Sequence, residues 1–299
     1  NLTPSLAMRM LAKYLALETV RVNGGMHPAE RGFWVDNHGF GVNADNWSLF
    51  LQASSQSRGC SPFNLVDLFC RAGGLPEGRR ENHLAGAGDA ARQEFRRRLA
   101  NEAATIVSEE ERRSLKGFAG IQMGASQEMR RWPVDRFAAL SRHMLGELGL
   151  CPVLLGSSSE KELSRRFRQA GGIGIDLVGK TSLMELAAAM SQLSVLATND
   201  TGTMHLAAGL GVPVAAVFLA TAQPWDTGPY LAGTCCLEPD LACHPCPFHA
   251  PCECEEACRH TITVDSMFAL VQTYLATGQW TAPAPEIRAG ARIWRTVRD

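Results

Sequence analysis

TNDTGTMHLAAGLG, the stretch formed by residues 198–211, decides the fold. A mostly apolar run over residues 193–197 arrives at this polar corner, and an Ala- and Leu-rich helix leaves it. Thr201, Gly202 and Thr203 suit the mouth of a helix, because a side-chain oxygen or a bare backbone leaves the first N–H groups free. Such a helix opening, at the carboxyl end of a strand, is where α/β proteins bind anions. The stretch therefore predicts an anion site, with the rest of the chain as its scaffold.

Around this stretch, strands and helices alternate with loops of a few residues. We expect strands over residues 117–123, 152–155, 173–178, 195–198 and 212–219, and helices over 135–148, 160–170, 182–193 and from 203 onward. Such alternation is typical of βαβ units with a parallel sheet. Right-handed crossovers place all the strand-end loops on one edge of that sheet. The loops expected to converge there are residues 124–131, 156–160, 179–181, 199–205 and 220–230.

Residues 1–115 have a less regular pattern. We expect a helix over residues 6–20, turns with one short strand at 32–35, and a helix over 63–70. Residues 89–115 are charged and helical, and their final charge run is typical of a solvated helix face or linker. We therefore place the domain boundary between residues 115 and 116. In the second domain, 116–299, we also expect a helix over 267–275 and a tail helix within 284–299.

The composition excludes several classes of protein. The length of 299 residues fits one large or two ordinary domains, and 45% hydrophobic with 20% charged residues is ordinary for a globular chain. A net charge of −1 argues against binding nucleic acid through bulk electrostatics. Neither a membrane-spanning apolar run nor a signal peptide is visible, so we expect a cytoplasmic protein. The chain begins at Asn1 rather than Met, which leaves open that the native start lies upstream.

The loop at residues 124–131 offers groups for binding a phosphate. Its small residues let a phosphate approach the backbone, Ser126 offers a hydroxyl, and Arg130 or Arg131 offers a fork of donors. The alternative is a surface loop with a solvated arginine pair. Trp132 and the proline after it are expected to pack and to start the next helix.

Glu160 and Lys180 follow two other strands. Glu160 either caps its helix or accepts hydrogen bonds from ribose hydroxyls, as strand-end acids do in nucleotide folds. Lys180 either provides a point charge for phosphate or is an exposed lysine before a helix capped by Ser182. The residues alone do not decide between the two interpretations of Glu160, whereas for Lys180 they favour the exposed lysine.

Asp200 and His205 flank the helix mouth of the opening stretch. Asp200 either caps backbone amides or binds a substrate hydroxyl, and His205 either donates to an anion or is a satisfied polar group of the core. The Asp-Thr-Gly sequence also occurs in aspartic proteases, but in all-β lobes, so we reject that interpretation. The chain has no Asp-x-Asp pair that would hold a metal-bound diphosphate, which leaves charge neutralisation to Arg, Lys and the helix dipole.

In order along the chain, these motifs resemble the ADP-heptose:lipopolysaccharide heptosyltransferases, glycosyltransferase family 9. The resemblance runs from about residue 118 to residue 264. Its Asp-Thr-Gly-x-x-His element, Asp200 to His205, is fairly specific. The other pieces are weak singly and strong in sequence: Met123-Gly124-Ala125-Ser126, Arg130-Arg131-Trp132-Pro133, Leu155-Gly156 with Glu160, Gly179-Lys180-Thr181-Ser182-Leu183, His205-Leu206-Ala207-Ala208, Pro213 and Pro224.

The resemblance implies a GT-B architecture of two Rossmann-like domains, with the nucleotide held by the C-terminal one. It implies inverting, metal-independent transfer of heptose from an ADP-sugar, without a cofactor, to the lipopolysaccharide core, a lipid-linked oligosaccharide. The enzyme would work at the cytoplasmic face of the inner membrane, in peripheral contact with it. By position, Ser126 and Arg130 would contact the diphosphate, although the family usually has Lys at the latter place, and Glu160 would bind the ribose. The remaining site positions carried over are Lys180, Thr181, Asp200, Thr201, Gly202 and His205.

The sequence departs from the family at its N-terminal side. Family members begin with a strand and a Gly-Asp loop whose aspartate deprotonates the acceptor, and no such segment precedes Leu2. We therefore expect either a missing N-terminal portion, so that residues 1–115 are an incomplete acceptor-side domain, or a degenerate relative. Asp36, His38 and Asp45 are substitute bases by their chemistry alone, so no catalytic residue is assigned. The rival functions are a GT-B transferase with another donor and a nucleotide-binding protein without catalysis.

Cysteines gather near the end of the second domain. Seven of the ten lie between Cys235 and Cys258, and the later ones have the spacing Cys243-x-x-Cys246, Cys252-x-Cys254 and Cys258. This spacing resembles a metal site, and His244, His249 and His260 are further potential ligands. Similar cysteines recur at this place in the resembled family without an obligatory metal. We therefore favour free thiols over structural zinc and expect no metal.

Overall fold

The computed structural model describes most of the second half of the chain and parts of the first. The described residues are 33–35, 41–43, 46–56, 61, 63–73, 75, 84–231, 233–246, 252, 254–283 and 290–295. Contacts divide the chain into two units, Asn1–Arg79 and Arg80–Asp299. The helix expected over residues 6–20 and the candidate bases Asp36, His38 and Asp45 lie outside the described residues.

The first unit contains a small hairpin and a helix pair. Strands β1 (Phe33–Val35) and β2 (Gly41–Asn43) pair antiparallel, which confirms a short strand near residue 33. Helix α3 (Leu65–Ala72) begins where the Asn64 side chain accepts the N–H of Val66, as N-cap residues do, and confirms the second expected helix. It packs on α2 (Asn46–Gln56) around a small apolar core.

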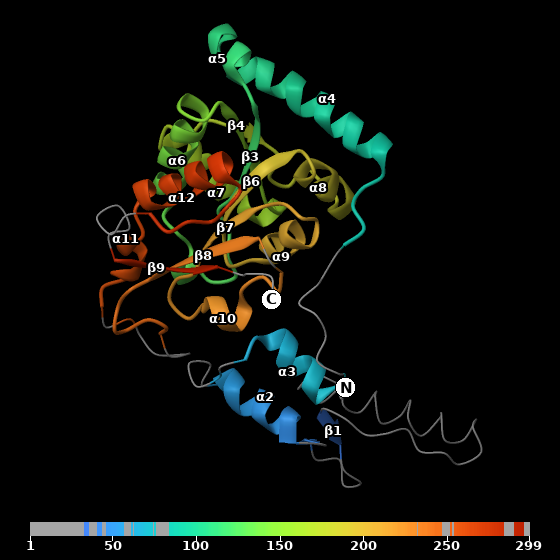
Figure 1. Cartoon of the computed structure of the whole chain (residues 1–299), viewed down its shortest axis with the longest axis vertical. Coiled ribbons are helices and arrows are strands. Elements are labelled where there is room, and N and C mark those ends of the chain that lie inside the picture. Colours follow the sequence, from blue (N-terminus) through green and yellow to red (C-terminus); the bar gives the residue numbers. More distant parts are fainter. Residues whose placement is uncertain are drawn as a thin grey trace, which may run out of the picture. The chain divides into compact units, whose positions relative to one another are not determined.

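The second unit is built on a seven-stranded sheet (Figure 1). Its order is β5-β4-β3-β6-β7-β8-β9, and every neighbouring pair is parallel except β8 and β9. Because β3, the first of these strands in the chain, lies between β4 and β6, the topology reverses there. Ligands of doubly wound sheets bind outside the carboxyl ends of strands at such a point. The strands are β3 (Gly117–Gln122), β4 (Leu150–Leu155), β5 (Ile175–Asp176), β6 (Leu193–Asn199), β7 (Val214–Val217), β8 (Thr234–Pro239) and β9 (Ala291–Arg295).

Helices cover both faces of this sheet (Figure 1). Successive side chains of a strand point to opposite faces, so in β7 Ala215 and Val217 join one core while Val214 and Ala216 join the other. The first core is closed by α6 (Val134–Gly146), α7 (Lys161–Gln169) and α12 (Val264–Thr277), and the second by α4 (Asp89–Ile106), α8 (Leu183–Met190) and α9 (Gly202–Gly209). Shorter helices are α5 (Glu109–Ser114), η2 (Glu128–Arg130), η3 (Ser158–Glu160), α10 (Pro224–Thr227) and α11 (Cys258–Thr261).

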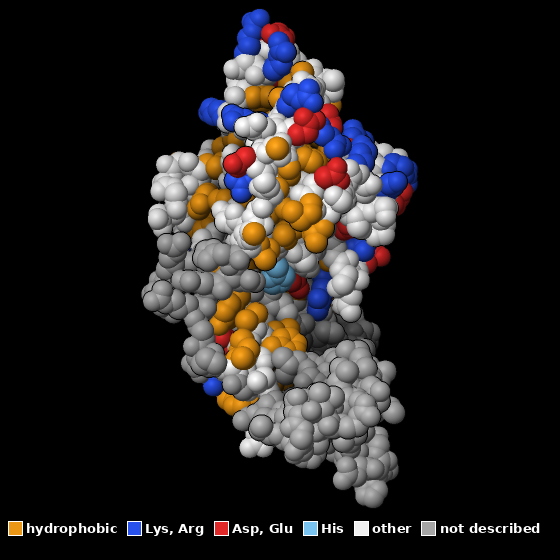
Figure 2. Space-filling view, turned by 90° about the vertical axis from the view of Figure 1, so that its right-hand side faces the viewer, with side chains coloured by type: hydrophobic (Ala, Val, Ile, Leu, Met, Phe, Trp, Pro, Cys, Tyr) orange, Lys and Arg blue, Asp and Glu red, His pale blue; other side chains and the backbone are white. Residues whose placement is uncertain are grey.

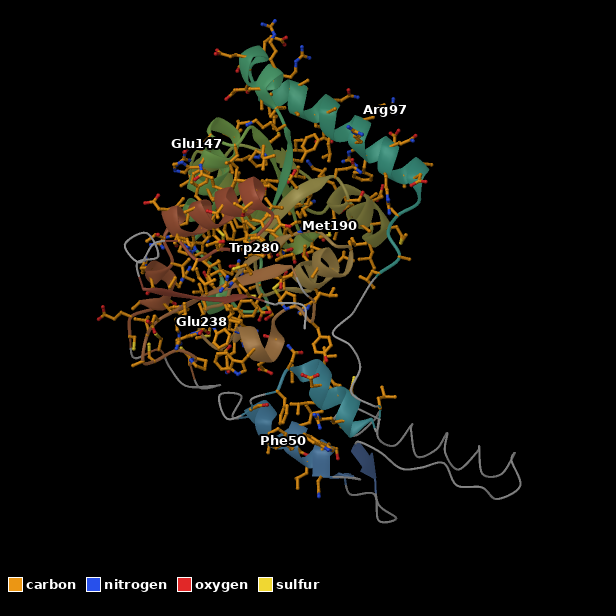
Figure 3. All side chains as sticks on the ribbon, viewed as in Figure 1. Phe50, Arg97, Glu147, Met190, Glu238 and Trp280 are labelled. Carbon is orange, nitrogen blue, oxygen red and sulfur yellow. The ribbon has the colours of Figure 1, made fainter. Side chains whose placement is uncertain are left out.

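The linker region belongs to the second unit. Phe95, Leu99 and Ala103 of α4 are buried in the core under α8, which places α4 inside this unit rather than before it. Contacts thus divide the units between Arg79 and Arg80, whereas the domain boundary between residues 115 and 116 stays a prediction. The outer face of α4 and α5 is charged, as expected of a solvated face (Figure 2), and Arg97 of α4 points outward (Figure 3).

The expected tail helix is wrong, because residues 291–295 form strand β9. This strand pairs antiparallel with β8, which the sequence analysis also did not predict. The physical reason is Glu238, a fully buried carboxylate on β8 (Figure 3). It accepts the indole N–H of Trp294 at 2.7 Å and lies 3.1 Å from Nε of Arg292. A buried carboxylate needs such donors, and an edge strand supplies them.

Candidate functional site

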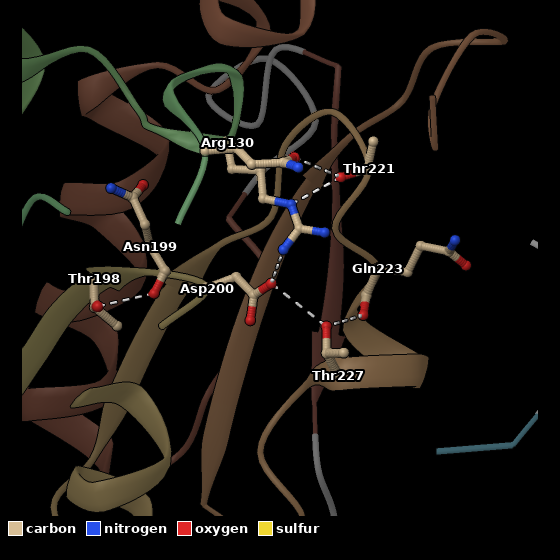
Figure 4. Close-up of polar contacts among 8 residues, drawn as sticks. Arg130, Thr198, Asn199, Asp200, Thr221, Gln223 and Thr227 are labelled. Atoms are coloured by element: carbon tan, nitrogen blue, oxygen red, sulfur yellow. Dashed lines mark hydrogen bonds and ion pairs between the residues drawn. The ribbon is translucent and has the colours of Figure 1, made fainter. Parts of the chain in front are cut away.

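The site lies where β3, β6 and β7 end. Loops 123–133, 199–202 and 218–227 follow these three strands, as the converging-loop prediction requires. Figure 4 shows the polar residues that meet there. The network joins residues about seventy to ninety positions apart in the chain.

Arg130 is the centre of this network. Its side chain is only 10% exposed, although the residue sits in the short helix η2. Nε donates to Oγ1 of Thr221 at 2.8 Å, and Nη1 lies 3.4 Å from Oδ2 of Asp200, whose side chain is 9% exposed. The hydroxyl of Thr221 is in turn 3.4 Å from Oε1 of Gln127. The guanidinium is therefore buried, paired and fixed in orientation.

Asp200 is held from both sides. Its N–H donates to the carbonyl of Val217 on the neighbouring strand, at 3.2 Å. The hydroxyl of Thr227 in α10 lies 3.5 Å from Oδ2 and 3.3 Å from the carbonyl of Gln223 (Figure 4). Asp200 thus belongs to an ion pair with Arg130 and does not cap α9, whose N-cap is Thr201.

The mouth of α9 remains open. Thr201 has extended backbone, and its side chain makes no capping hydrogen bond. Among the described residues, its buried hydroxyl has no partner. A Cβ built on Gly202 would meet no atom within 4 Å, so space lies above the first helical residue. Within the described part of the chain, the helix therefore presents its N-terminal dipole to open space beside Gly202. That an anion binds there stays a prediction.

Glu160 sits close to the ends of β3 and β4. Its carboxylate accepts hydrogen bonds from the N–H and hydroxyl of Ser157 at 2.6 and 2.9 Å, and from Nε2 of Gln122 at 3.0 Å. The Ser157 contacts form a capping box, so the capping interpretation is correct. A Cβ on Gly124 would lie 1.3 Å from Oε1, which shows that the carboxylate occupies the space this glycine leaves. Whether it also binds ribose stays a prediction.

Ser126, Lys180 and Thr181 lie outside the Arg130 network. Ser126 is exposed in the bend before η2. Lys180 is exposed, and its ammonium donates to the carbonyl of Asp176 at 2.7 Å, within its own turn. Ser182 caps α8 in a capping box with Glu185, as expected if Lys180 is an exposed lysine before a capped helix. Thr181 is half-buried between them.

His205 lies in the first turn of α9, where part of the residue is exposed but protein atoms surround the imidazole. Desolvation by the surrounding protein lowers the pKa of this imidazole from its ordinary value, and the Asp200 carboxylate offsets part of that effect. At neutral pH the ring is therefore neutral and has one donor and one acceptor nitrogen.

Two side chains anchor the loop that carries Arg130. Trp132 is fully buried, packs edge-on against Phe137 and donates its indole N–H to the carbonyl of Ile262, which confirms that it packs. Its main-chain N–H donates to Oδ1 of Asn199, the last residue of β6, at 2.9 Å. The loop is thus fastened to the core just past Arg130.

The cysteine-rich segment is not a single cluster. Cys235 and Cys236 are buried in β8, and no group of three His, Cys, Asp or Glu side chains is placed to hold a metal within the described parts of the chain. Cys246 donates its N–H to the carbonyl of Ala220 at 2.9 Å. Burial, with the neighbouring thiols, raises the pKa of Cys246 to about 11. Burial also raises the pKa of Cys258, an effect that the amide of Ala220 partly offsets.

Ala220 itself has a φ of 53°, in the left-handed region that costs an alanine about 1–2 kcal/mol. Thr221, the partner of Arg130, follows directly. The cysteine-rich segment therefore supports the strained turn that delivers Thr221 to the site.

Sequence reasoning missed several members of the network. Gln122, Gln127, Thr221 and Thr227 carry no motif of their own. The available signal was their position, because all four lie at the ends of strands or in loops already expected to converge.

The sequence of the chain is similar to those of known glycosyltransferases. Residues 76–257, more than half of the chain, match the family described as glycosyltransferase family 9 (heptosyltransferase). Lipooligosaccharide heptosyltransferase 2 of Haemophilus influenzae is 29% identical over 119 residues, 38% of this chain and 33% of that protein. Lipopolysaccharide heptosyltransferase 2 of Salmonella typhimurium is 30% identical over 112 residues, 36% of this chain and 31% of that protein. The chain thus spans about a third of the length of these curated relatives.

The similarity extends to solved structures. The ADP-heptose lipopolysaccharide heptosyltransferase II of E. coli has the same fold and superposes with a TM-score of 0.50 at 20% identity, over 66% of this chain and 54% of that one. The family 9 glycosyltransferase of Veillonella parvula gives a TM-score of 0.48 at 24% identity, over 59% of this chain and 49% of that one. None of the described helices is both long and apolar enough to cross a membrane.

Proposed function

The chain belongs to glycosyltransferase family 9, the heptosyltransferase family, and on that premise we propose that it transfers a heptose from an ADP-sugar to a lipopolysaccharide core acceptor. The named relatives support the sugar and the acceptor. The observation that carries the proposal is the pairing of Arg130 with Asp200 beside the uncapped mouth of α9. Both lie at the point where the sheet topology reverses.

The chemistry requires stabilisation of a leaving anion. In an inverting transfer, an acceptor hydroxyl oxygen bonds to the anomeric carbon while the bond from that carbon to the β-phosphate oxygen breaks. The electron pair leaves with ADP, and the hydroxyl proton passes to a base, to which we assign no residue. Positive groups that meet the developing charge lower the barrier. Arg130 and the first amides of α9 supply such groups, so the transfer needs no metal ion or other cofactor.

The nucleotide would lie along the strand ends. We assign the diphosphate to Arg130, Ser126 and the amides of Gly202 and Thr203, with Lys180 and Thr181 at the periphery. Asp200 and His205 would line the junction of diphosphate and sugar, together with Thr201, whose buried hydroxyl has no partner among the described residues. Glu160 would accept hydrogen bonds from the ribose through its exposed edge. The acceptor is a lipid-linked oligosaccharide, which would bring the enzyme to the cytoplasmic face of the inner membrane without nucleic-acid partners.

Calorimetric titration with ADP, UDP, GDP and adenosine tests this proposal. We expect ADP to bind most tightly, adenosine much more weakly, and a chelator to leave the ADP affinity unchanged. Product analysis with an ADP-heptose and a core oligosaccharide then tests transfer. Equal or tighter binding of UDP would reject the donor, and loss of ADP binding with the chelator would reject metal independence.

A further inference from the structure

Asn199 connects the two halves of the site. It is the last residue of β6, is fully buried and directly precedes Asp200. Its Oδ1 accepts the main-chain N–H of Trp132 at 2.9 Å. Its Nδ2 donates to the carbonyls of Met123 at 2.8 Å and Gly124 at 3.4 Å. One side chain thus satisfies three backbone groups of another loop.

These partners stand at the two ends of the loop that carries Arg130. Met123 and Gly124 begin the loop, and Trp132 follows Arg130 by two residues. The Asn199 amide therefore closes this loop across the β3–β6 boundary, and it does so one residue away from Asp200. The Asn199 side chain therefore holds the loop that carries Arg130, and the Asn199 backbone continues directly into Asp200.

We propose that Asn199 is a positioning residue that sets the separation between Arg130 and Asp200 and so holds Arg130 in place for an anionic ligand. The inference rests on the proposed function for the identity of that ligand, a nucleoside diphosphate. Only a carboxamide of this length offers one acceptor and two donors at these positions. An aspartate would place a buried negative charge against two carbonyl oxygens, which burial and the missing donors disfavour.

The test compares Asn199→Ala and Asn199→Asp with Ser141→Ala. Ser141 is a matched control, because it is also fully buried and its hydroxyl also accepts a loop N–H, that of Ile173 at 3.1 Å, away from the site. The ratio of adenosine to ADP dissociation constants isolates the diphosphate contribution. We expect Asn199→Ala to reduce this ratio about tenfold or more, since a small misplacement of a charged donor is costly. Ser141→Ala should leave the ratio unchanged while lowering the unfolding temperature.

Two further readouts keep the inference independent of folding defects and of the proposed function. In Asn199→Asp, the new carboxyl group, once protonated, can donate to one carbonyl and accept from Trp132. The defect of this variant relative to wild type should therefore shrink between pH 8 and pH 5. Hydrogen exchange of the 123–132 loop should accelerate in the Asn199 variants and not in Ser141→Ala.

The outcomes separate the two ideas. A lowered unfolding temperature with an unchanged ratio and unchanged exchange in the 123–132 loop would reduce Asn199 to a structural role and overturn the inference. A wild-type chain that does not distinguish ADP from adenosine would instead reject the proposed function. In that case the loop exchange still decides the role of Asn199.

Discussion

Nη1 of Arg130 lies 3.4 Å from Oδ2 of Asp200, although seventy residues separate them in the chain. Both side chains are about nine-tenths buried, so the pair is shielded from water far better than a surface ion pair. Removal of either partner would leave a charge that is costly to bury. The pair therefore orients Arg130 before any ligand arrives.

Replacement of Arg130 by alanine should weaken ADP binding about 10- to 100-fold, the value of a hydrogen bond to a charged group. Adenosine affinity should change little, because the lost group faces phosphate. Titration calorimetry with both ligands measures the difference. Arg165→Ala is the charge-matched control, since that guanidinium is 60% exposed on α7. An equal loss for ADP and adenosine would reject the phosphate assignment.

Glu160→Ala should weaken ADP binding, and Gly124→Ala should do the same by an indirect route. A Cβ at Gly124 would lie 1.3 Å from Oε1 of Glu160 and displace the carboxylate. In the Glu160→Ala background, Gly124→Ala should then add little, so the two effects are not additive. A calorimetric double-mutant cycle measures this coupling. Unchanged affinity in Glu160→Ala would remove the ribose role.

Gly202→Ala should separate stability from binding. A Cβ there meets nothing within 4 Å, and alanine is a better helix former than glycine by roughly 0.5–1 kcal/mol. We expect an unchanged or slightly raised unfolding temperature and weaker ADP binding, because the methyl group enters the helix mouth. Gly146→Ala is the matched control, as its Cβ also meets nothing within 4 Å. Unchanged ADP affinity in Gly202→Ala would place the ligand elsewhere.

His205 should make the binding of ADP depend on pH. Its folded pKa is lowered from 6.5, so the free protein carries a neutral ring at pH 7 and charges it only on further acidification. The neutral ring therefore costs the folded protein no stability at pH values above the pKa of the unfolded state. As pH falls below that pKa, the free energy of unfolding declines. A bound diphosphate favours the charged ring, but the terminal phosphate of ADP also takes up a proton between pH 7 and pH 5. The contribution of His205 is therefore the ratio of wild-type to His205→Gln affinity, which should rise on acidification. Equal pH profiles of the two proteins would contradict this role.

Trp294→Phe should test the strand that replaced the expected tail helix. Phenylalanine keeps a ring against Trp225 but removes the N–H that Glu238 accepts at 2.7 Å. The buried carboxylate then lacks one donor, and we expect a loss of about 1–3 kcal/mol in the free energy of unfolding. Denaturant titration measures it. A loss below experimental error would show that the hydrogen bond to Trp294 does not stabilise β9.

Apolar runs that alternate with helices and short loops were sufficient to predict the parallel strands β3 to β7 and the loops that converge at their ends. β9 escaped prediction for two reasons. Only Ala291 and Ile293 pack toward the core, and the donors that hold the strand, Arg292 and Trp294, meet a carboxylate far away in the sequence, Glu238 on β8. Charge on the outer face of α4 concealed its buried side, Phe95 and Leu99, so the sequence did not reveal that this helix packs within the second unit.

For the site, motifs indicated Arg130, Asp200 and Glu160, which the structure holds at adjacent strand ends. The sequence pattern could not reveal that Asp200 pairs with Arg130 instead of capping α9, because this pairing depends on the register of β3, β6 and β7. It also could not reveal that Lys180 binds its own turn, because a lysine can reach several partners.

The Ala220 turn makes the cysteine-rich segment useful as a place for a reporter. Its carbonyl is held by Cys246 and its amide lies against Cys258, so both ends of the segment that contains Cys252 contact the residue next to Thr221. Among the described cysteines, Cys252 is the exposed one. A fluorophore attached to Sγ of Cys252 would lie on a segment whose two ends contact the turn before Thr221, beside the proposed nucleotide site. Occupancy by donor or product could then be followed optically in real time, without a labelled sugar.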